Sequence, residues 1–535
     1  MKSKQERSRP QALEWIALVV GLVLILRYRW LLDDAFVYFR YLDNLLFLDI
    51  GLVFNQGEYV EGFSSAAWLL LLLPIRALSI DYWYMVQALG CLVFVGFWYG
   101  LVTLNRRLSP TGTIINLPLL FLAVNYGVLS YFTSGLETPL VQLMAVLYAL
   151  YILDPSSRRL EVAVALSPLV RPELAVPLIL VGAWSWYRQG RFPTRLKTLA
   201  VIFVGGWVLF RIYYYADLFP NTFYLKHLLS YRQGLIYLHQ TLSSYHFYAI
   251  AALVAGGLVF LRWRGVKGLA VGERLVMVTV AASVTTYVVS IGGDPRHFRF
   301  LAFPFCLAVC SFAGVAERLI QPLSAWGQRV AVPLGVALLA VFFIAYPPQL
   351  DAHPVTLKEN HQRVRKISDA SYHRHMRRLK HRRWSKKANR ELMREYTEQH
   401  PTFRYEGVGK GFWCVRIYQR FDRRIIHSLG LTDAFLARTE MEAKRTAHKW
   451  GLRKLARDIT AVYRSTSQPG RGMFRWAAER NEAPEWIAAN LDTIEVIERK
   501  VFNRHRFLEN LSLALTFPGK IDPEKGDDGY PRQKR

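Results

Sequence analysis

The sequence predicts a polytopic α-helical membrane protein with a soluble domain at its C-terminal end. Three observations indicate this fold class. The 535 residues are 52% hydrophobic and 14% aromatic, with a mean hydropathy of +0.14, which is too apolar for a soluble protein of this length. Up to Pro347, apolar runs alternate with short polar loops, and each run approaches the roughly 20 residues that a helix needs to cross the hydrocarbon. No such run follows Pro347.

The change of composition near Pro347 divides the chain into two predicted domains, a membrane domain over residues 1–347 and a soluble domain over residues 348–535. The part from Asp351 onward holds 40 Lys and Arg against 23 Asp and Glu, so it carries 17 of the 28 excess positive charges. Its densest basic stretch, Arg363 to Arg390, is not accompanied by a nucleic-acid-binding motif. We therefore expect a solvated or lipid-facing basic surface, and no nucleic acid as a partner.

The distribution of Lys and Arg predicts the topology, because cytoplasmic loops are enriched in both. The basic N-terminus and the apolar run Ala12 to Leu26 indicate an uncleaved signal anchor that starts in the cytoplasm. Ser64 to Ile80 is expected to be a juxtamembrane or re-entrant segment, since a crossing there would place Arg106 and Arg107 outside. About eleven spans result, with an extracytoplasmic C-terminal domain of α/β or mixed structure. They are expected at residues 12–26, 85–104, 113–132, 139–153, in two short helices within 160–187 that meet at Arg171, and at 199–215, 245–261, 275–291, 300–315 and 330–346.

Two adjacent carboxylates, Asp33 and Asp34, directly follow the first span. An ionised side chain in hydrocarbon costs about 3 kcal/mol even on the mildest scales, so an acidic pair at this point indicates a site at the membrane surface. The structural alternative is a helix cap, in which Asp accepts backbone N–H bonds. Other acidic and basic residues share the predicted outer face: Arg40, Glu58, Glu61, Glu137, Arg171, Glu173, Lys226, His227, Asp294, Arg296, His297 and Arg299. Mixed charge suits a site that handles a proton and an anion together.

Several short segments, in the same order along the chain as in a known family, carry a resemblance to that family. They are residues 33–41, 51–58 and 60–65 of the first outer loop, then 134–138, 171–173, 220–226, 292–294 with 299–301, and 429–438. In these segments the chain resembles the bacterial GT-C glycosyltransferases related to terminal β-(1→2)-arabinofuranosyltransferases of cell-wall arabinan. The resemblance extends to about residue 460. The basic stretch Arg363 to Arg390 and the tail beyond Ser465 have no counterpart in it, which leaves the acceptor open.

The resemblance implies a GT-C fold in a bacterial plasma membrane, with a juxtamembrane helical first loop that carries a catalytic Asp. It further implies a polyprenyl-phosphate sugar as donor, a cell-envelope glycan as acceptor, and inverting transfer outside the cytoplasm. Such a reaction needs a carboxylate that takes the proton of the acceptor hydroxyl and cations that stabilise the departing phosphate. Asp33 or Asp34 is the predicted base, with Asp33 preferred. Arg171 is the first choice for the phosphate, because Pro172 restricts it and a guanidinium binds phosphate in a fork; an ion pair with Glu173 is the structural alternative.

Further candidates follow from the same outer loops. The expected phosphate-binding residues also include Lys226, Arg296, His297 and Arg299, and the expected substrate-binding residues are Arg40, Glu61, Glu137, Glu173, Asn221 and Asp294. The glycine pair before Asp294 predicts a tight turn that tips the carboxylate inward. No cofactor is identified, and a divalent cation stays open. The alternatives are a GT-C transferase that uses another lipid-linked sugar to modify a protein or glycolipid, and a secondary transporter, which would place its charges near the bilayer midplane.

Overall fold

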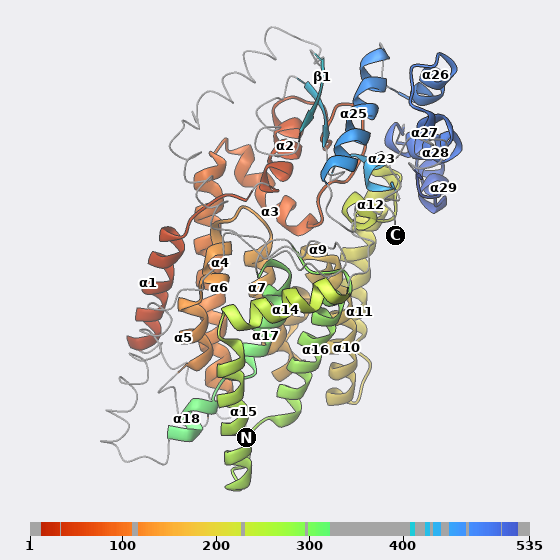
Figure 1. Ribbon diagram of the computed structural model, residues 1–535. Coiled ribbons are helices and arrows are strands. Elements are labelled where there is room, and N and C mark those ends of the chain that lie inside the picture. Colours follow the sequence, from red (N-terminus) through yellow and green to blue (C-terminus); the bar gives the residue numbers. More distant parts are fainter. Residues whose placement is uncertain are drawn as a thin grey trace.

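The computed structural model of this chain is built mostly of helices (Figure 1). It describes residues 12–32, 34–109, 116–225, 231–294, 298–320, 407–411, 423–427, 432–439, 449–466, 470–503 and 505–522. The described residues form two hydrophobic cores. One lies in the helix bundle of the first part of the chain, and the other lies in the C-terminal part.

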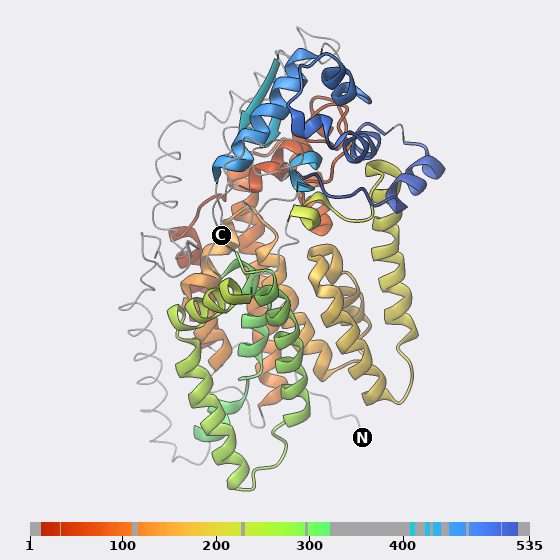
Figure 2. The ribbon, with the colours of Figure 1, turned by 45° about the vertical axis from the view of Figure 1, so that its right-hand side comes forward.

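The bundle and the first loop account for the first part of the chain (Figures 1 and 2). The elements are α1 (Ala12–Arg27), α2 (Ala35–Leu46), α3 (Ala66–Ala77), α4 (Tyr82–Leu108), α5 (Leu117–Val124), α6 (Tyr126–Leu129), η1 (Ser130–Thr133), α7 (Thr138–Leu153), α8 (Arg158–Ala165), α9 (Ser167–Val170), η2 (Pro172–Leu174), α10 (Ala175–Gln189), α11 (Thr194–Ala200), η3 (Val201–Gly205), α12 (Gly206–Tyr215), α13 (Asn221–Leu225), α14 (Tyr231–Ser244), α15 (Phe247–Trp263), α16 (Val271–Ser290), η4 (Arg299–Leu301), α17 (Ala302–Cys310) and α18 (Val315–Ile320).

Several of these helices are long and apolar enough to cross a membrane, as expected of a membrane protein. The described residues contain four such helices, at Tyr82–Leu108, Thr194–Tyr215, Val271–Ser290 and Arg299–Ile320. A fifth span results if α14 and α15, which are bent by 73° at their junction, are taken as one. Large apolar side chains remain exposed on the bundle, including Leu253, which is 71% exposed. Apolar exposure of this extent fits a surface that faces lipid.

The described residues contain fewer helices of spanning length than the eleven expected spans. The described part of the segment 113–132, from Asn116 on, is divided into short elements, because the side chain of Asn125 accepts the N–H of Val128 and starts a new helix there. The segment 160–187 is broken at Arg171, as the sequence predicted. α3 is not counted among the eleven: its 12 residues, about 18 Å at the usual helical rise, are too short to cross alone. The expected span 330–346 lies outside the described residues.

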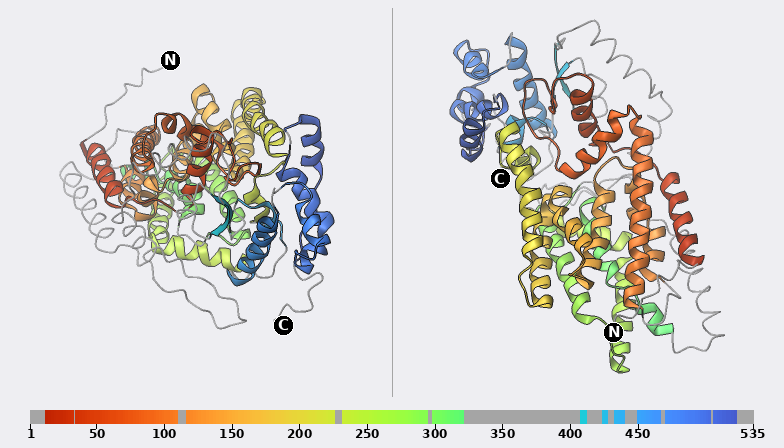
Figure 3. Two further views of the ribbon diagram at one scale, coloured as in Figure 1. Left: turned by 90° about the horizontal axis from the view of Figure 1, so that it is seen from above. Right: turned by 180° about the vertical axis from the view of Figure 1, so that it is seen from behind.

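The C-terminal unit is mainly helical and contains a small sheet. Its elements are β1 (Gly407–Gly411), β2 (Arg423–His427), α23 (Ala434–Ala437), α25 (Lys449–Ser465), α26 (Met473–Glu479), α27 (Glu485–Ala488), α28 (Leu491–Val501) and α29 (Phe507–Leu515). β1 and β2 pair in parallel, with Gly407 opposite Arg423. The second core joins buried residues of these helices to Val60 of the first loop. Seen from above, the unit lies toward the α12 side of the bundle (Figure 3).

The first loop is bound tightly to the C-terminal unit. Asn55 accepts the N–H of Ile425 at 3.0 Å and donates to the carbonyl of the same residue at 3.0 Å, as a neighbouring strand would. Glu58 pairs with Arg424, and the N–H of Tyr59 donates to the carbonyl of Val501 at 2.8 Å. The unit therefore sits over the end of the bundle where α1 leads into α2 (Figure 1).

Candidate functional site

Six of the predicted site residues meet in one place, although they come from segments up to 265 residues apart. They are Asp34, Glu137, Arg171, Glu173, Asp294 and Arg299, and we call them the charge cluster. The cluster lies where α2 begins, beside the turns that precede α7, η2 and η4. Four carboxylates thus surround two guanidinium groups.

Arg299 is the centre of the cluster. Its Nη1 lies 3.1 Å from Oδ2 of Asp34 and 3.6 Å from Oδ2 of Asp294, and its Nη2 lies 3.5 Å from Oε1 of Glu137. The side chain of Asp34 is 27% exposed, whereas those of its partners are buried. Asp34 is therefore the carboxylate of this group that a ligand from outside can reach most easily.

Arg171 forms the second half of the cluster. Its Nη1 lies 3.3 Å from Oε1 of Glu137, and its Nη2 lies 2.5 Å from Oε1 of Glu173. The guanidinium also lies over the ring of Phe300 at 4.6 Å. Arg171 is 6% exposed and Glu137 is fully buried. The ion pair with Glu173, the structural alternative for Arg171, is thus present, and Glu137 joins the two arginines.

The first loop contributes a phenol to the same group. Tyr38, one turn into α2, donates to Oε2 of Glu137 at 3.5 Å and accepts the N–H of Ser65 at 3.2 Å. Burial, together with the negative charge of Glu137, raises the pKa of the Tyr38 phenol. Tyr38 therefore stays protonated and remains a hydrogen-bond donor to the carboxylate.

Glycines allow the turns of the cluster to approach one another. Gly135 has a φ of +79°, and a Cβ there would lie 2.8 Å from Cβ of Ala35, so the turn before α7 packs directly on the start of α2. Gly292 and Gly293 have φ values of +83° and +74°, and they form the expected turn before Asp294. Asp294 is 7% exposed and points at Arg299, in agreement with the sequence prediction that this turn tips the carboxylate inward.

Asp34 does not serve as a capping residue in the structure. It occupies the N-cap position of α2, yet its φ and ψ of −63° and −18° are helical and its side chain makes no capping hydrogen bond. An N-cap residue that binds backbone N–H groups normally adopts extended angles instead. The carboxylate points to Arg299. The capping alternative therefore does not describe Asp34.

Four predicted residues fall outside the described part of the chain, namely Asp33, Lys226, Arg296 and His297. Within the described residues, no group of three or more His, Cys, Asp or Glu is arranged to hold a metal ion. The carboxylates of the charge cluster are directed at guanidinium groups.

Arg40 lies away from the charge cluster, although it was predicted to bind substrate. Its Nε donates to the carbonyl of Phe54 at 2.8 Å, and its Nη2 donates to the carbonyl of Arg423 at 3.0 Å. The residue is 2% exposed. Its guanidinium therefore ties α2 to the first loop and to β2.

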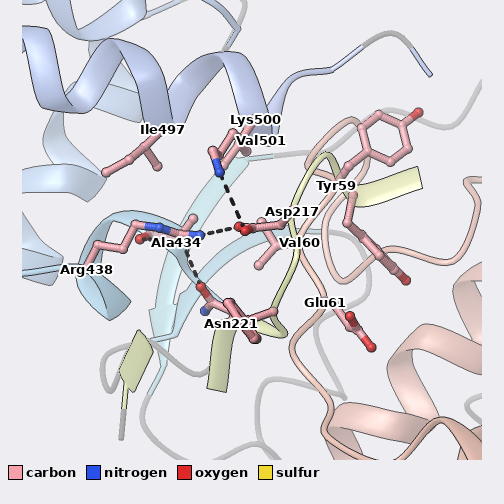
Figure 4. A pocket seen from close by; sticks show the side chains of 12 residues that line it. Tyr59, Val60, Glu61, Asp217, Asn221, Ala434, Arg438, Ile497, Lys500 and Val501 are labelled. Atoms are coloured by element: carbon pink, nitrogen blue, oxygen red, sulfur yellow. Dashed lines mark hydrogen bonds and ion pairs between the residues drawn. The ribbon is translucent and has the colours of Figure 1, made fainter. Parts of the chain in front are cut away.

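Glu61 and Asn221 lie together at a second polar site, between the first loop, the end of α12 and the C-terminal unit (Figure 4). Glu61 pairs with Arg211 and accepts from Nε1 of Trp207 at 3.2 Å. Asn221 accepts from Nη1 of Arg438 at 3.2 Å. The pocket beside them is small and partly open to solvent.

An ion-pair triad occupies one wall of this pocket. Asp217 pairs with Arg438 and lies 3.5 Å from Nζ of Lys500 (Figure 4). Burial lowers the pKa of Lys500, and Asp217 opposes that change. The triad joins the end of α12 to two elements of the C-terminal unit. The charged groups of the triad are directed at one another, so these contacts connect the helix bundle to the C-terminal unit.

Sequence reasoning missed Arg211, Asp217, Arg438 and Lys500. A signal existed for Arg211, because a charged residue inside the apolar run 199–215 is costly in a membrane unless it has a partner. The partner, Glu61, lies 150 residues away. Arg438 and Asp217 are 221 residues apart, and no local pattern in the sequence connects them.

The comparison with known proteins agrees with the stated resemblance. The chain is similar to a curated protein of Mycobacterium tuberculosis (strain ATCC 25618 / H37Rv) described as a terminal β-(1→2)-arabinofuranosyltransferase, with 28% identity over 338 residues. The match covers 52% of this chain and 51% of the relative, so the chain aligns with about half the length of that protein. No protein-family model matches the chain, and no solved structure matches it. The resemblance to arabinofuranosyltransferases is confirmed, and it supports a glycosyltransferase.

Proposed function

We propose that this chain is an inverting glycosyltransferase that moves a sugar, arabinofuranose, from a polyprenyl-phosphate donor to a cell-envelope glycan outside the cytoplasm. The observation that carries the proposal is the pair of Asp34 and Arg299 at the start of α2, in a chain similar to an arabinofuranosyltransferase. This pair joins a partly exposed carboxylate to a buried cation. Both groups are needed when a hydroxyl displaces a phosphate at a sugar carbon.

In the proposed reaction, Asp34, or its neighbour Asp33, takes the proton of the acceptor hydroxyl. The acceptor oxygen forms a bond to the anomeric carbon from the face opposite the phosphate, so the configuration inverts. The bond between that carbon and the phosphate oxygen breaks, and the polyprenyl phosphate leaves with the electron pair. Positive charge near the phosphate stabilises this departure.

Arg299 becomes the first choice for the phosphate, ahead of Arg171. Arg299 contacts the proposed base directly, whereas the carboxylates that Arg171 contacts are Glu137 and Glu173. The described cluster has two more carboxylates than guanidinium groups, and an anionic phosphate would be repelled by this excess. The proposal therefore assigns additional positive charge to Lys226, Arg296 and His297, which follow α13 and Asp294 in the sequence.

The charge distribution supports an extracytoplasmic site. Arg106 and Arg107 end α4, and Arg188 lies in the last turn of α10. These ends lie at the opposite end of the bundle from α2 and the C-terminal unit (Figures 1 and 3). Because Lys and Arg favour the cytoplasmic side, we propose that α2, the charge cluster and the C-terminal unit face outward.

The arrangement of charge argues against a secondary transporter. A transporter places its ionisable residues near the bilayer midplane, on broken helices. Here Asp34 lies at the start of α2 and Glu173 lies at the break before α10, both at the end of the bundle that carries the first loop. A site at one end of a bundle suits transfer between a lipid-anchored donor and an acceptor at the membrane surface.

The test is mass spectrometry of polyprenyl-phosphate sugars and envelope glycans from cells with the chain, without it, and with the double variant Asp33→Asn/Asp34→Asn. We expect loss of terminal arabinofuranose and accumulation of its lipid donor in the last two. Accumulation of another lipid-linked sugar would support the alternative transferase. Unchanged glycans and unchanged lipid-linked sugars in all three would refute the proposal.

A further inference from the structure

We propose that α29 of the C-terminal unit lies in the membrane–water interface, where it holds the unit against the same bilayer that α12 crosses. The inference starts from exposed apolar side chains. Within the described part of the C-terminal unit, the large apolar side chains that are exposed are Phe507, Leu508, Leu515 and Phe517, at 43%, 79%, 58% and 62%. All four lie in α29 or directly after it.

Two opposite faces of α29 are apolar. One face packs on the protein through the buried Asn510, Leu513 and Ala514. Leu508 and Leu515 lie seven residues apart, about two helical turns, so they share the opposite face. A surface helix of a soluble domain normally shows a polar outer face, and apolar residues on both faces indicate that a second apolar phase covers the helix.

The position of α29 identifies that phase as the bilayer. Nδ2 of Asn510 donates to the carbonyl of Tyr213 at 2.5 Å, and Nδ2 of Asn503 donates to the carbonyl of Tyr214 at 3.1 Å. Both carbonyls belong to the last turn of α12, which has no helical partner for them. These bonds fix α29 at the height where the Thr194–Tyr215 span ends, beside α12 (Figures 1 and 2).

The surroundings of α29 match an interface. The exposed face of α12 below it is apolar, with Leu209 at 55% and Tyr213 at 45%. Tyr side chains concentrate at membrane–water interfaces, so Tyr213 marks the level of the headgroups. Arg506, exposed directly before α29, suits contact with lipid phosphates. The exposed face of α29 thus continues the lipid-facing surface of a predicted span.

The experiment measures contact between α29 and acyl chains in the full-length protein. The native Cys residues are replaced, and a fluorescent NBD group is attached to Leu508→Cys in nanodiscs with or without phospholipids that carry a nitroxide on the upper acyl chain. Leu209→Cys on α12 is the positive control, and Glu482→Cys, on an exposed turn after α26, is the negative control. We expect nitroxide lipids to quench the first two labels and to leave the third unchanged.

A pair of variants tests whether the apolar face is the cause. A label at Phe517→Cys should lose its quenching in Leu508→Asp/Leu515→Asp, and should keep it in Asn481→Asp, which adds charge at an exposed turn after α26, away from α29. Quenching at Leu209 without quenching at Leu508 would overturn the proposal. Cross-linking between Leu508→Cys residues of two copies, with no quenching, would assign the face to a second copy and would also overturn it.

Discussion

Replacing Asp34 by Asn separates the proposed chemistry from stability more sharply than any other single change. Asn keeps the shape and can still accept from Arg299, but it cannot take a proton. Loss of a general base lowers the rate by roughly 10² to 10⁴, or about 3 to 5 kcal/mol of barrier. The stability cost is small, because Asp34 makes no capping bond, is 27% exposed, and leaves Arg299 paired with Glu137 and Asp294. A partly exposed ion pair contributes about 0 to 1 kcal/mol.

The assay uses purified protein in nanodiscs with a polyprenyl-phosphate arabinose and an arabinan acceptor, and it records turnover beside thermal unfolding. Asp33→Asn is measured beside it, because Asp33 is the other candidate for the base. We expect at least one of the two variants to lose about a hundredfold or more in turnover while unfolding at nearly the parent temperature. Parent-level transfer by both variants would refute the assigned base. Loss of activity only together with loss of folding would assign a structural role to Asp34.

Three further predictions follow from particular contacts. Arg299→Lys should weaken donor binding about tenfold in a titration, whereas Arg171→Lys should mainly lower the unfolding temperature. Equal effects of the two variants on donor binding would contradict the assignment of Arg299 to the phosphate. Gly90→Ala should destabilise the protein by about 1 to 3 kcal/mol in thermal unfolding, because the new Cβ would lie 1.8 Å from the carbonyl oxygen of Phe132. Gly96→Ala is the control: its Cβ would meet only Leu143, at 3.9 Å, so this variant should be neutral or slightly stabilising. Burial raises the pKa of the Asp433 carboxyl to about 7, so the folded state binds its proton more tightly than the unfolded state does. The free energy of unfolding should therefore fall as the pH rises from about 4 to 7. Asp433→Asn should reduce this pH dependence, and an unchanged pH dependence would exclude Asp433 as its source.

The sequence predicted the members of the charge cluster better than it predicted the spans. The cluster could be anticipated because charged residues beside apolar runs need partners, and two of its members stood at a break that Pro or Gly marked: Arg171 before Pro172, and Asp294 after Gly293. Such breaks depend on local backbone preferences, which the sequence shows directly. The turns therefore appear where they were expected.

Fewer spans than expected are found among the described residues, in part because apolar content alone does not define a helix. The segment 113–132 is apolar enough, but Asn125 starts a separate short helix within it. The pairing inside the charge cluster was also beyond the sequence. Glu137 was expected to bind substrate, yet its fully buried carboxylate joins Arg171 to Arg299, and only the packing of three distant turns brings these groups together.

The placement of Arg40 connects the C-terminal unit to the proposed base. Asp34 and Arg40 both belong to the first loop. Asp34 lies at the start of α2 and pairs with Arg299, and Arg40, less than two turns further along the helix, donates to the carbonyls of Phe54 and Arg423. A helix fixed at two points on different parts of the protein has a defined direction. A buried guanidinium also loses its hydration, so removing its carbonyl partners would be costly, and β2 is thereby kept in place. The C-terminal unit thus helps to set the position of the carboxylate, even though its own described residues lie outside the charge cluster.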